Sequence, residues 1–237
     1  MFELSEKKGV AAVIVAAGNS ERFGKNKLDG LICGIPCIAL TLSAFEKSEE
    51  TLQTVVVTKK EKIEDILLLK EKYGLNKLSA VTEGGECRQE SAAKGVAATD
   101  SEICFIAVHD GARPLVLPED IDRVAREAYE YGAAAAVIKQ INTVKAVENG
   151  FIANTIPREK TAMSVTPQIF SREIYNRIMN ELGGSFREFT DDSSMAEKLG
   201  IKVKAVYCSS GNIKITTADD MIVANALFYE RLKERER

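Results

Sequence analysis

Short apolar runs rich in β-branched residues recur along the chain, and segments with helical spacing separate them. The apolar runs predict buried strands and lie at Val10–Ala16, Thr54–Thr58, Leu78–Thr82, Ile103–Val108 and Ala134–Ile138. The segments with helical spacing lie at Pro36–Lys47, Lys60–Tyr73, Arg88–Ala98 and Pro118–Tyr131. Strands that alternate with helices predict right-handed crossovers. We therefore expect an α/β fold with a mostly parallel, Rossmann-like sheet and helices on both faces.

The alternation breaks after Ile138. Asn149-Gly150, a strong signal for a tight hairpin, stands between two short alternating segments. We expect a β-arm at about residues 140–160, protruding from a single domain that spans residues 1–237. The later elements that we predict are helices at Arg172–Leu182 and Asp192–Leu199, a strand at Lys202–Tyr207, and a helix from the capping box Thr217–Asp220 to about Arg231.

The composition is that of an ordinary globular protein, with 237 residues of which 45 % are hydrophobic and 28 % charged. The formal net charge of -3 gives no reason to expect nucleic acid or an anionic membrane as a partner. No window approaches the roughly 18 continuous apolar residues of a membrane span. The charged start, Met1–Lys8, carries no signal-peptide cleavage pattern. We therefore expect a cytoplasmic protein.

Five cysteines are scattered along the chain, and an odd number without regular spacing argues against a disulfide framework. Cys33 and Cys37 have a spacing that suits a metal, but no second pair exists and His109 is the only histidine. Buried small thiols are therefore a better interpretation than a structural zinc site.

The first candidate site is the segment from Ala16 to Lys27, at the end of the first predicted strand. Open α/β sheets bind ligands at the carboxyl ends of their strands, so this location favours a site. Gly18 and Gly24 let backbone N–H groups approach phosphate oxygens, and Arg22 and Lys27 supply positive charge. The spacing matches neither a Walker A loop nor G-x-G-x-x-G. We interpret the loop as a phosphate site rather than an ordinary basic surface loop.

Two further segments follow predicted strands. Asp110 can hold Mg²⁺ or a ribose hydroxyl beside a bound nucleotide, and Arg113 can serve an anion. The alternative is an Asp–Arg surface pair of little energetic value. His109 is interpreted as a structural neighbour, because nucleotidyl transfer from an ionised phosphate needs no general base. Lys214 could reach the same cleft, although a solvated lysine is the simpler interpretation.

Together these segments resemble the family of 2-C-methyl-D-erythritol 4-phosphate cytidylyltransferases, enzymes of the non-mevalonate isoprenoid pathway with a nucleotidyltransferase sheet. The resemblance covers nearly the whole chain in order. The matching pieces are AAVIVAAG (11–18), Arg22 with Lys27, EGGECRQES (83–91), VHDGARP (108–114), Thr143, Arg158, TPQIF (166–170), TDDSSMAEKLG (190–200) and GNIKITTADD (211–220).

The resemblance implies transfer of CMP from CTP to 2-C-methyl-D-erythritol 4-phosphate, which gives 4-diphosphocytidyl-2-C-methyl-D-erythritol and pyrophosphate. It also implies Mg²⁺ or another divalent cation, and a homodimer joined through the β-arm. The implied catalytic residues are Arg22, Lys27, Arg158 and Lys214. The implied nucleotide-binding residues are Ala17, Gly18, Gly85, Glu86, Arg88 and Ser91. The residues implied to line the sugar-phosphate region are Asp110, Arg113 and Thr143, with Asp110 also at the metal. For Arg88, a surface position at the start of a helix stays open as an alternative.

The chain departs from the family pattern at Asn26, where the family often has proline, and at Gly211, where an aspartate frequently stands. If that aspartate helps bind the metal in the family, either Asp110 must do more in this chain or water must fill the position. Two alternatives stay open, namely an enzyme for ribitol 5-phosphate or a related polyol phosphate, and a non-catalytic nucleotide-binding relative. Ala112 favours the methylerythritol enzyme over the ribitol enzyme. Retention of five charged residues counts against a non-catalytic relative. These residues are Arg22, Lys27, Asp110, Arg158 and Lys214.

Overall fold

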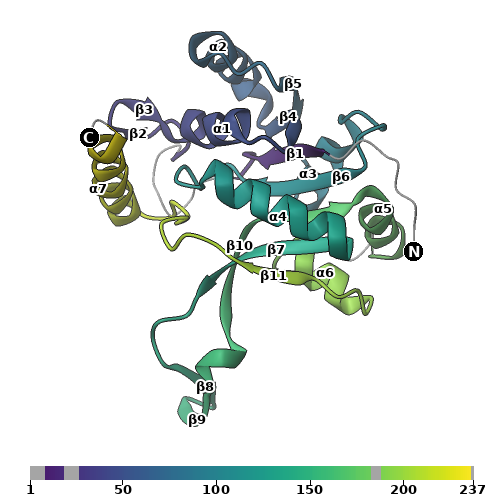
Figure 1. Cartoon of the computed structure of the whole chain (residues 1–237), viewed down its shortest axis with the longest axis vertical. Helices are drawn as coiled ribbons and strands as arrows, with labels where there is room; N and C mark the ends of the chain where they lie inside the picture. The colour runs from purple at the N-terminus through teal and green to yellow at the C-terminus, as the bar shows by residue number, and fades with distance from the viewer. Residues whose placement is uncertain (1–8, 19–26, 183–187, 236–237) are drawn as a thin grey trace.

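A computed structural model describes residues 9–18, 27–182 and 188–235. Within them, seven strands form a central sheet with the order β11-β7-β10-β6-β1-β4-β5 (Figure 1). Parallel pairing joins every neighbouring pair except those of β10, which is antiparallel to β6 and β7. The strands are β1 (Val10–Val15), β4 (Thr51–Thr58), β5 (Leu78–Glu83), β6 (Phe105–Asp110), β7 (Ala133–Lys139), β10 (Ala162–Ser171) and β11 (Lys204–Tyr207). The predicted mostly parallel α/β sheet is confirmed.

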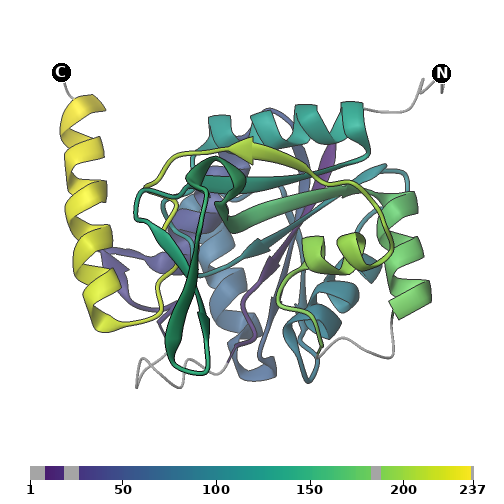
Figure 2. The ribbon, with the colours of Figure 1, turned by 90° about the horizontal axis from the view of Figure 1, so that it is seen from below.

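Helices cover both faces of the sheet, and the alternation of side chains along β1 shows how. Val10, Ala12 and Ile14 pack in the core beneath α1 and α4, whereas Ala11 and Val13 pack with α3, α5 and α6. Figure 2 shows α4 on one side of the sheet and α5 with α6 on the other. The helices are α1 (Cys37–Lys47), α2 (Ile63–Tyr73), α3 (Arg88–Ala97), α4 (Pro118–Tyr131), α5 (Arg172–Leu182), α6 (Asp192–Lys198) and α7 (Ala218–Arg235).

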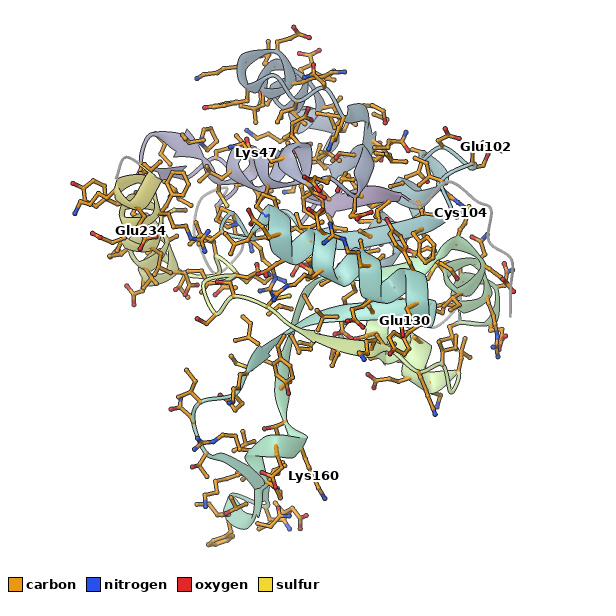
Figure 3. All side chains as sticks on the ribbon, viewed as in Figure 1. Lys47, Glu102, Cys104, Glu130, Lys160 and Glu234 are labelled. Atoms are coloured by element: carbon orange, nitrogen blue, oxygen red, sulfur yellow. The ribbon has the colours of Figure 1, made fainter. Side chains whose placement is uncertain are left out.

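The predicted arm is a hairpin of β8 (Val144–Glu148) and β9 (Phe151–Ile156) that projects away from the sheet (Figure 1). Asn149 and Gly150 both have positive φ, of 52° and 85°, as a tight primed turn requires. A single 3₁₀ turn, η3 (Arg158–Lys160), follows the hairpin, and Lys160 points away from the body of the molecule (Figure 3).

The C-terminal helix α7 begins at the predicted capping box. The Oδ2 atom of Asp220 accepts a hydrogen bond from the backbone N–H of Thr217 at 2.8 Å, and the Oγ1 of Thr217 accepts one from the N–H of Asp220 at 3.3 Å. On its inner side, α7 contacts a small hairpin of β2 (Leu31–Ile32) and β3 (Ile35–Pro36). No described helix has both the length and the apolar character needed to cross a membrane. The cytoplasmic location stays a prediction.

Three details correct the sequence predictions. The central strand β10 was not predicted, because Pro167 inside the segment has no N–H to donate to a neighbouring strand. The register between β10 and β7 is irregular between Ser164 and Gln168, and this irregularity accommodates the proline. The strand β6 begins two residues later than predicted and includes Asp110 as its last residue. The thiol of Cys33 is exposed at the β2–β3 turn rather than buried, and all five cysteines are free.

Candidate active site

A cleft of about 490 Å³ opens at the carboxyl ends of β1 and β6, beside the N-terminus of α3. This is the edge of an α/β sheet at which ligands bind. The cleft is lined by Val15, Ala16, Ala17, Gly18, Lys27, Leu28, Gly85, Glu86, Cys87, Arg88, Ser91, Asp110, Ala112 and Lys214. The structure thus brings together predicted residues from four separate segments of the chain.

The loop before α3 is held by its own side chains. The Oγ of Ser91, which is 2 % exposed, accepts a hydrogen bond from the N–H of Gly85 and donates one to the carbonyl of Cys87, both at 2.9 Å. Cys87 is the N-cap of α3. A side chain at Gly84 would collide with Ala17, since its Cβ would lie 2.4 Å from the Cβ of Ala17. Close packing of these two loops therefore shapes the wall of the cleft, with the positive end of α3 directed toward it.

Lys27 is placed in the cleft by a turn that leads into β2. The N–H of Gly30 donates to the carbonyl of Lys27 at 3.3 Å, and the N–H of Ile38 donates to the carbonyl of Leu28 at 3.2 Å. These bonds fasten the turn to the start of α1. The side chain of Lys27 is half-buried and lines the cleft.

Asp110 stands at the centre of a cluster of cations. Its Oδ1 lies 3.1 Å from the Nε of Arg88, and its Oδ2 lies 3.2 Å from the Nε of Arg113 and 2.9 Å from the Nζ of Lys214. Burial alone would raise the pKa of the Asp110 carboxyl, but Arg88, Lys214 and Arg113 outweigh it and hold the pKa well below its usual range. Asp110 is therefore a carboxylate at every physiological pH.

Two buried residues tie this cluster to the rest of the sheet. The Oγ1 of Thr166 in β10 accepts a hydrogen bond from the N–H of Asp110 at 3.0 Å, and its carbonyl accepts one from the side chain of Asn212 at 2.8 Å. The carbonyl of Asn212 in turn accepts a bond from the Nη1 of Arg113 at 2.9 Å. The unpredicted strand β10 thus holds the end of β6 at Asp110 and the loop that carries Asn212 and Lys214.

Not every predicted site residue lies in the cleft. Arg113 is 8 % exposed and packs behind Asp110, so it supports the cleft rather than lining it. Thr143 and Arg158 are exposed on the arm and line no part of the cleft of their own chain. Arg22 lies outside the residues that the structure describes.

The glycine that departs from the family pattern lies against α7. A Cβ at Gly211 would lie 2.7 Å from the Nη2 of Arg231 in α7. A side chain at this position would therefore first meet the guanidinium of Arg231.

Sequence reasoning missed several residues that build the site, above all Asp192, Thr166 and Asn212. Each is buried, and each contacts the cluster from a segment distant in sequence. The available signal was their place in the TPQIF, TDDSSMAEKLG and GNIKITTADD segments, which carry the resemblance, although none of these three residues had an assigned role.

The donor set suits a divalent cation that arrives with a nucleotide. Among the described residues, no group of three or more His, Cys, Asp or Glu side chains could hold a metal. Asp110 offers one carboxylate, and Mg²⁺ commonly takes one or two carboxylates together with phosphate oxygens and water. The donor set is therefore compatible with Mg²⁺ held mainly by phosphate oxygens, to which Asp110 would contribute a carboxylate.

A mostly parallel sheet with a cation-lined cleft at its strand ends defines an α/β protein of the nucleotidyltransferase type. A profile of the 2-C-methyl-D-erythritol 4-phosphate cytidylyltransferases matches residues 10–230. The chain belongs to the 2-C-methyl-D-erythritol 4-phosphate cytidylyltransferase family.

Individual relatives agree with this family. The chain is 39% identical over 222 residues to the enzyme of that name from Caldanaerobacter subterraneus subsp. tengcongensis, covering 91% of this chain and 96% of the relative. It is 36% identical over 226 residues to the one from Dehalococcoides mccartyi, covering 94% and 97%. The crystal structure of 4-diphosphocytidyl-2C-methyl-D-erythritol synthase from Anaerococcus prevotii superimposes with a TM-score of 0.84 at 27% identity, covering 94% and 96%.

Proposed function

We propose that this chain transfers CMP from CTP to 2-C-methyl-D-erythritol 4-phosphate and releases pyrophosphate. The observation that carries the proposal is the cleft, where Lys27, Arg88 and Lys214 surround the end of β1 in a chain of this family. Three cations at the carboxyl end of a strand suit a triphosphate and a second phosphate.

The reaction is an in-line displacement at phosphorus. An oxygen of the acceptor phosphate attacks the α-phosphorus of CTP, and the bond from that phosphorus to the bridging oxygen of pyrophosphate breaks. Two anions meet and charge builds on a five-coordinate phosphorus, so catalysis rests on positioning and on cations. We assign stabilisation of that charge to Lys27 and Arg22, and binding of the acceptor phosphate to Lys214 and Arg158.

The nucleotide contacts that we propose come from the loop after β1 and the loop before α3, which line the cleft. Ala17 and Gly18 would approach the phosphates, and the Gly85–Glu86 backbone would read the cytosine edge. Ser91 would act by holding Gly85, to which it is hydrogen-bonded. When bound, Mg²⁺ would neutralise phosphate charge, with Asp110 as its protein ligand.

We further propose a homodimer in which the arm of each protomer reaches the partner's cleft. Thr143 and Arg158 lie on the arm, outside their own cleft. The arm is a two-stranded ribbon whose large apolar side chains Val147, Phe151 and Ile152 are 62%, 78% and 68% exposed. A lone ribbon of this kind is only marginally stable in water, so a partner surface is expected to cover it.

The test is pyrophosphate release with CTP and a panel of polyol phosphates. We expect turnover with 2-C-methyl-D-erythritol 4-phosphate, loss of activity on chelation of divalent cations, and recovery with Mg²⁺. The Lys27→Ala chain, purified in the same way, is the control for contaminating enzymes and should lose roughly a hundred- to a thousandfold in kcat. Equal or better turnover of ribitol 5-phosphate would move the assignment to that acceptor.

A further inference from the structure

The buried carboxylate of Asp192 lies directly behind the cleft. Asp192 is the first residue of α6 and is 1 % exposed, and its Oδ2 accepts a hydrogen bond from the Nη1 of Arg88 at 2.6 Å. Its Oδ1 is buried and accepts no hydrogen bond from the residues that the structure describes. A buried carboxylate requires a compensating cation, and Arg88 provides that cation.

Arg88 is held from two sides. Its Nε donates to Asp110 at 3.1 Å while its Nη1 donates to Asp192, and the two contacts fix the plane of the guanidinium. Within the described part of the chain, no group accepts a hydrogen bond from its Nη2. Since Arg88 lines the cleft, the two N–H groups of Nη2 and the second N–H of Nη1 remain as donors for a ligand there.

We propose that Asp192 is a positioning residue for the nucleotide: it holds Arg88 so that Nη2 donates to an oxygen of bound CTP. The inference rests on the proposed function, which supplies the ligand. Asp192 does not line the cleft, so it acts through Arg88. Without it, Asp110 would be the sole carboxylate partner of Arg88, and the guanidinium could turn out of the cleft.

The neighbouring Asp191 offers a matched comparison. It is the N-cap of α6, and its carboxylate accepts bonds from the N–H of Ser194 at 2.9 Å, from Ser164 at 2.7 Å and from Gln168 at 2.8 Å. Both carboxylates lie at the start of α6, but Asp191 caps the helix and Asp192 accepts the bond from Arg88.

The experiment measures CTP binding by calorimetry in the absence of acceptor. We expect Asp192→Asn to weaken binding about ten- to a hundredfold, as for a lost charge-assisted hydrogen bond. Asp191→Asn should stay within about twofold of wild type although it lowers Tm, since its carboxylate caps α6 and ties it to β10 but makes no bond to Arg88. Arg88→Met should lose as much as Asp192→Asn, and the double variant should bind no more weakly than Arg88→Met alone. Asp192→Ser, which suits the start of a helix, replaces Asp192→Asn if that variant misfolds.

Additive losses in the double variant would mean that Asp192 does not act through Arg88 and would overturn the proposal. An equal loss in Asp191→Asn would also overturn it, by assigning both residues to the stability of α6. Wild-type chain that binds CTP but releases no pyrophosphate would contradict the proposed reaction, while the binding results still decide the role of Asp192.

Discussion

At the scale of single residues, His109, which precedes Asp110 in the chain, shows how burial sets the protonation state of a side chain. His109 is fully buried and packs edge-on against the ring of Phe45, with centroids 4.9 Å apart. Burial, only partly opposed by the carboxylate of Asp110, lowers the pKa of His109 to about 3. The imidazole is therefore neutral, as expected for a structural neighbour rather than a base.

This burial predicts a specific dependence of stability on pH. The unfolded chain binds a proton at His109 below a pH of about 6.5. The folded chain does not bind it until about pH 3. Lowering the pH between these values therefore lowers the free energy of unfolding. The slope should approach about 1.4 kcal/mol per pH unit by pH 5. Urea denaturation from pH 7.5 to 4.5 measures it.

His109→Phe is the control for that measurement, because it keeps a ring beside Phe45 and removes the titration. The carboxylate of Asp110 contributes pH dependence only below about pH 4, where its unfolded form takes up a proton. If the free energy of unfolding of His109→Phe depends on pH as steeply as that of the wild type, other groups cause the dependence.

At the scale of elements, α4 carries a buried carboxylate that organises the turn between α1 and β4. Asp122 is 7 % exposed, and its Oδ1 accepts hydrogen bonds from the Oγ of Ser48 at 2.6 Å and the N–H of Glu50 at 3.1 Å. Its Oδ2 accepts a third from the N–H of Glu49 at 3.3 Å. One side chain thus satisfies backbone donors of a turn 72 to 74 residues away in sequence.

Replacing this carboxylate should destabilise the fold strongly. We expect Asp122→Ala to lower the free energy of unfolding by about 3 kcal/mol, because three hydrogen bonds to a charged group are lost, one of them from the buried hydroxyl of Ser48. Glu130→Ala, at an exposed position of α4 (Figure 3), is the control and should stay within about 0.5 kcal/mol. The measurement is the urea midpoint at unchanged m-value. A loss below about 0.5 kcal/mol in Asp122→Ala would contradict this role.

At the scale of the whole molecule, the arm carries two of the proposed site residues away from the cleft of its own chain. It projects beyond the sheet (Figure 1), and it carries Thr143 and Arg158 away from the cleft that contains Lys27 and Lys214. If the proposed dimer forms, each active site combines the cleft of one protomer with the arm of its partner.

Mixing of inactive variants tests this arrangement. Lys27→Ala and Arg158→Ala chains, dissociated and reassociated together, should recover roughly a quarter of wild-type activity, since half the dimers are mixed and each has one intact site. The control mixes Lys27→Ala with Lys214→Ala, whose defects lie in the same cleft, and should recover nothing. A monomer in solution, or no recovery in the first mixture, would rule out action in trans.

The sequence by itself determined most of the elements and the position of the site. Local patterns specify these features, because strand alternation, the Asn149-Gly150 turn and the Thr217–Asp220 capping box each act within a few residues. Loops at the ends of parallel strands meet at one edge of a sheet, so Lys27, Asp110 and the loop before α3 could be placed together in advance.

Only the tertiary structure decided which partners these residues have. Arg88 pairs with Asp192 across 104 positions, and Thr166 binds the N–H of Asp110 across 56. The strand β10, which brings Thr166 there, was hidden because Pro167 breaks its local pattern. Burial also decides the protonation state of His109. Burial and the surrounding cations together decide the pKa of Asp110. Such contacts and desolvation depend on packing between distant segments, which no local pattern of residues specifies.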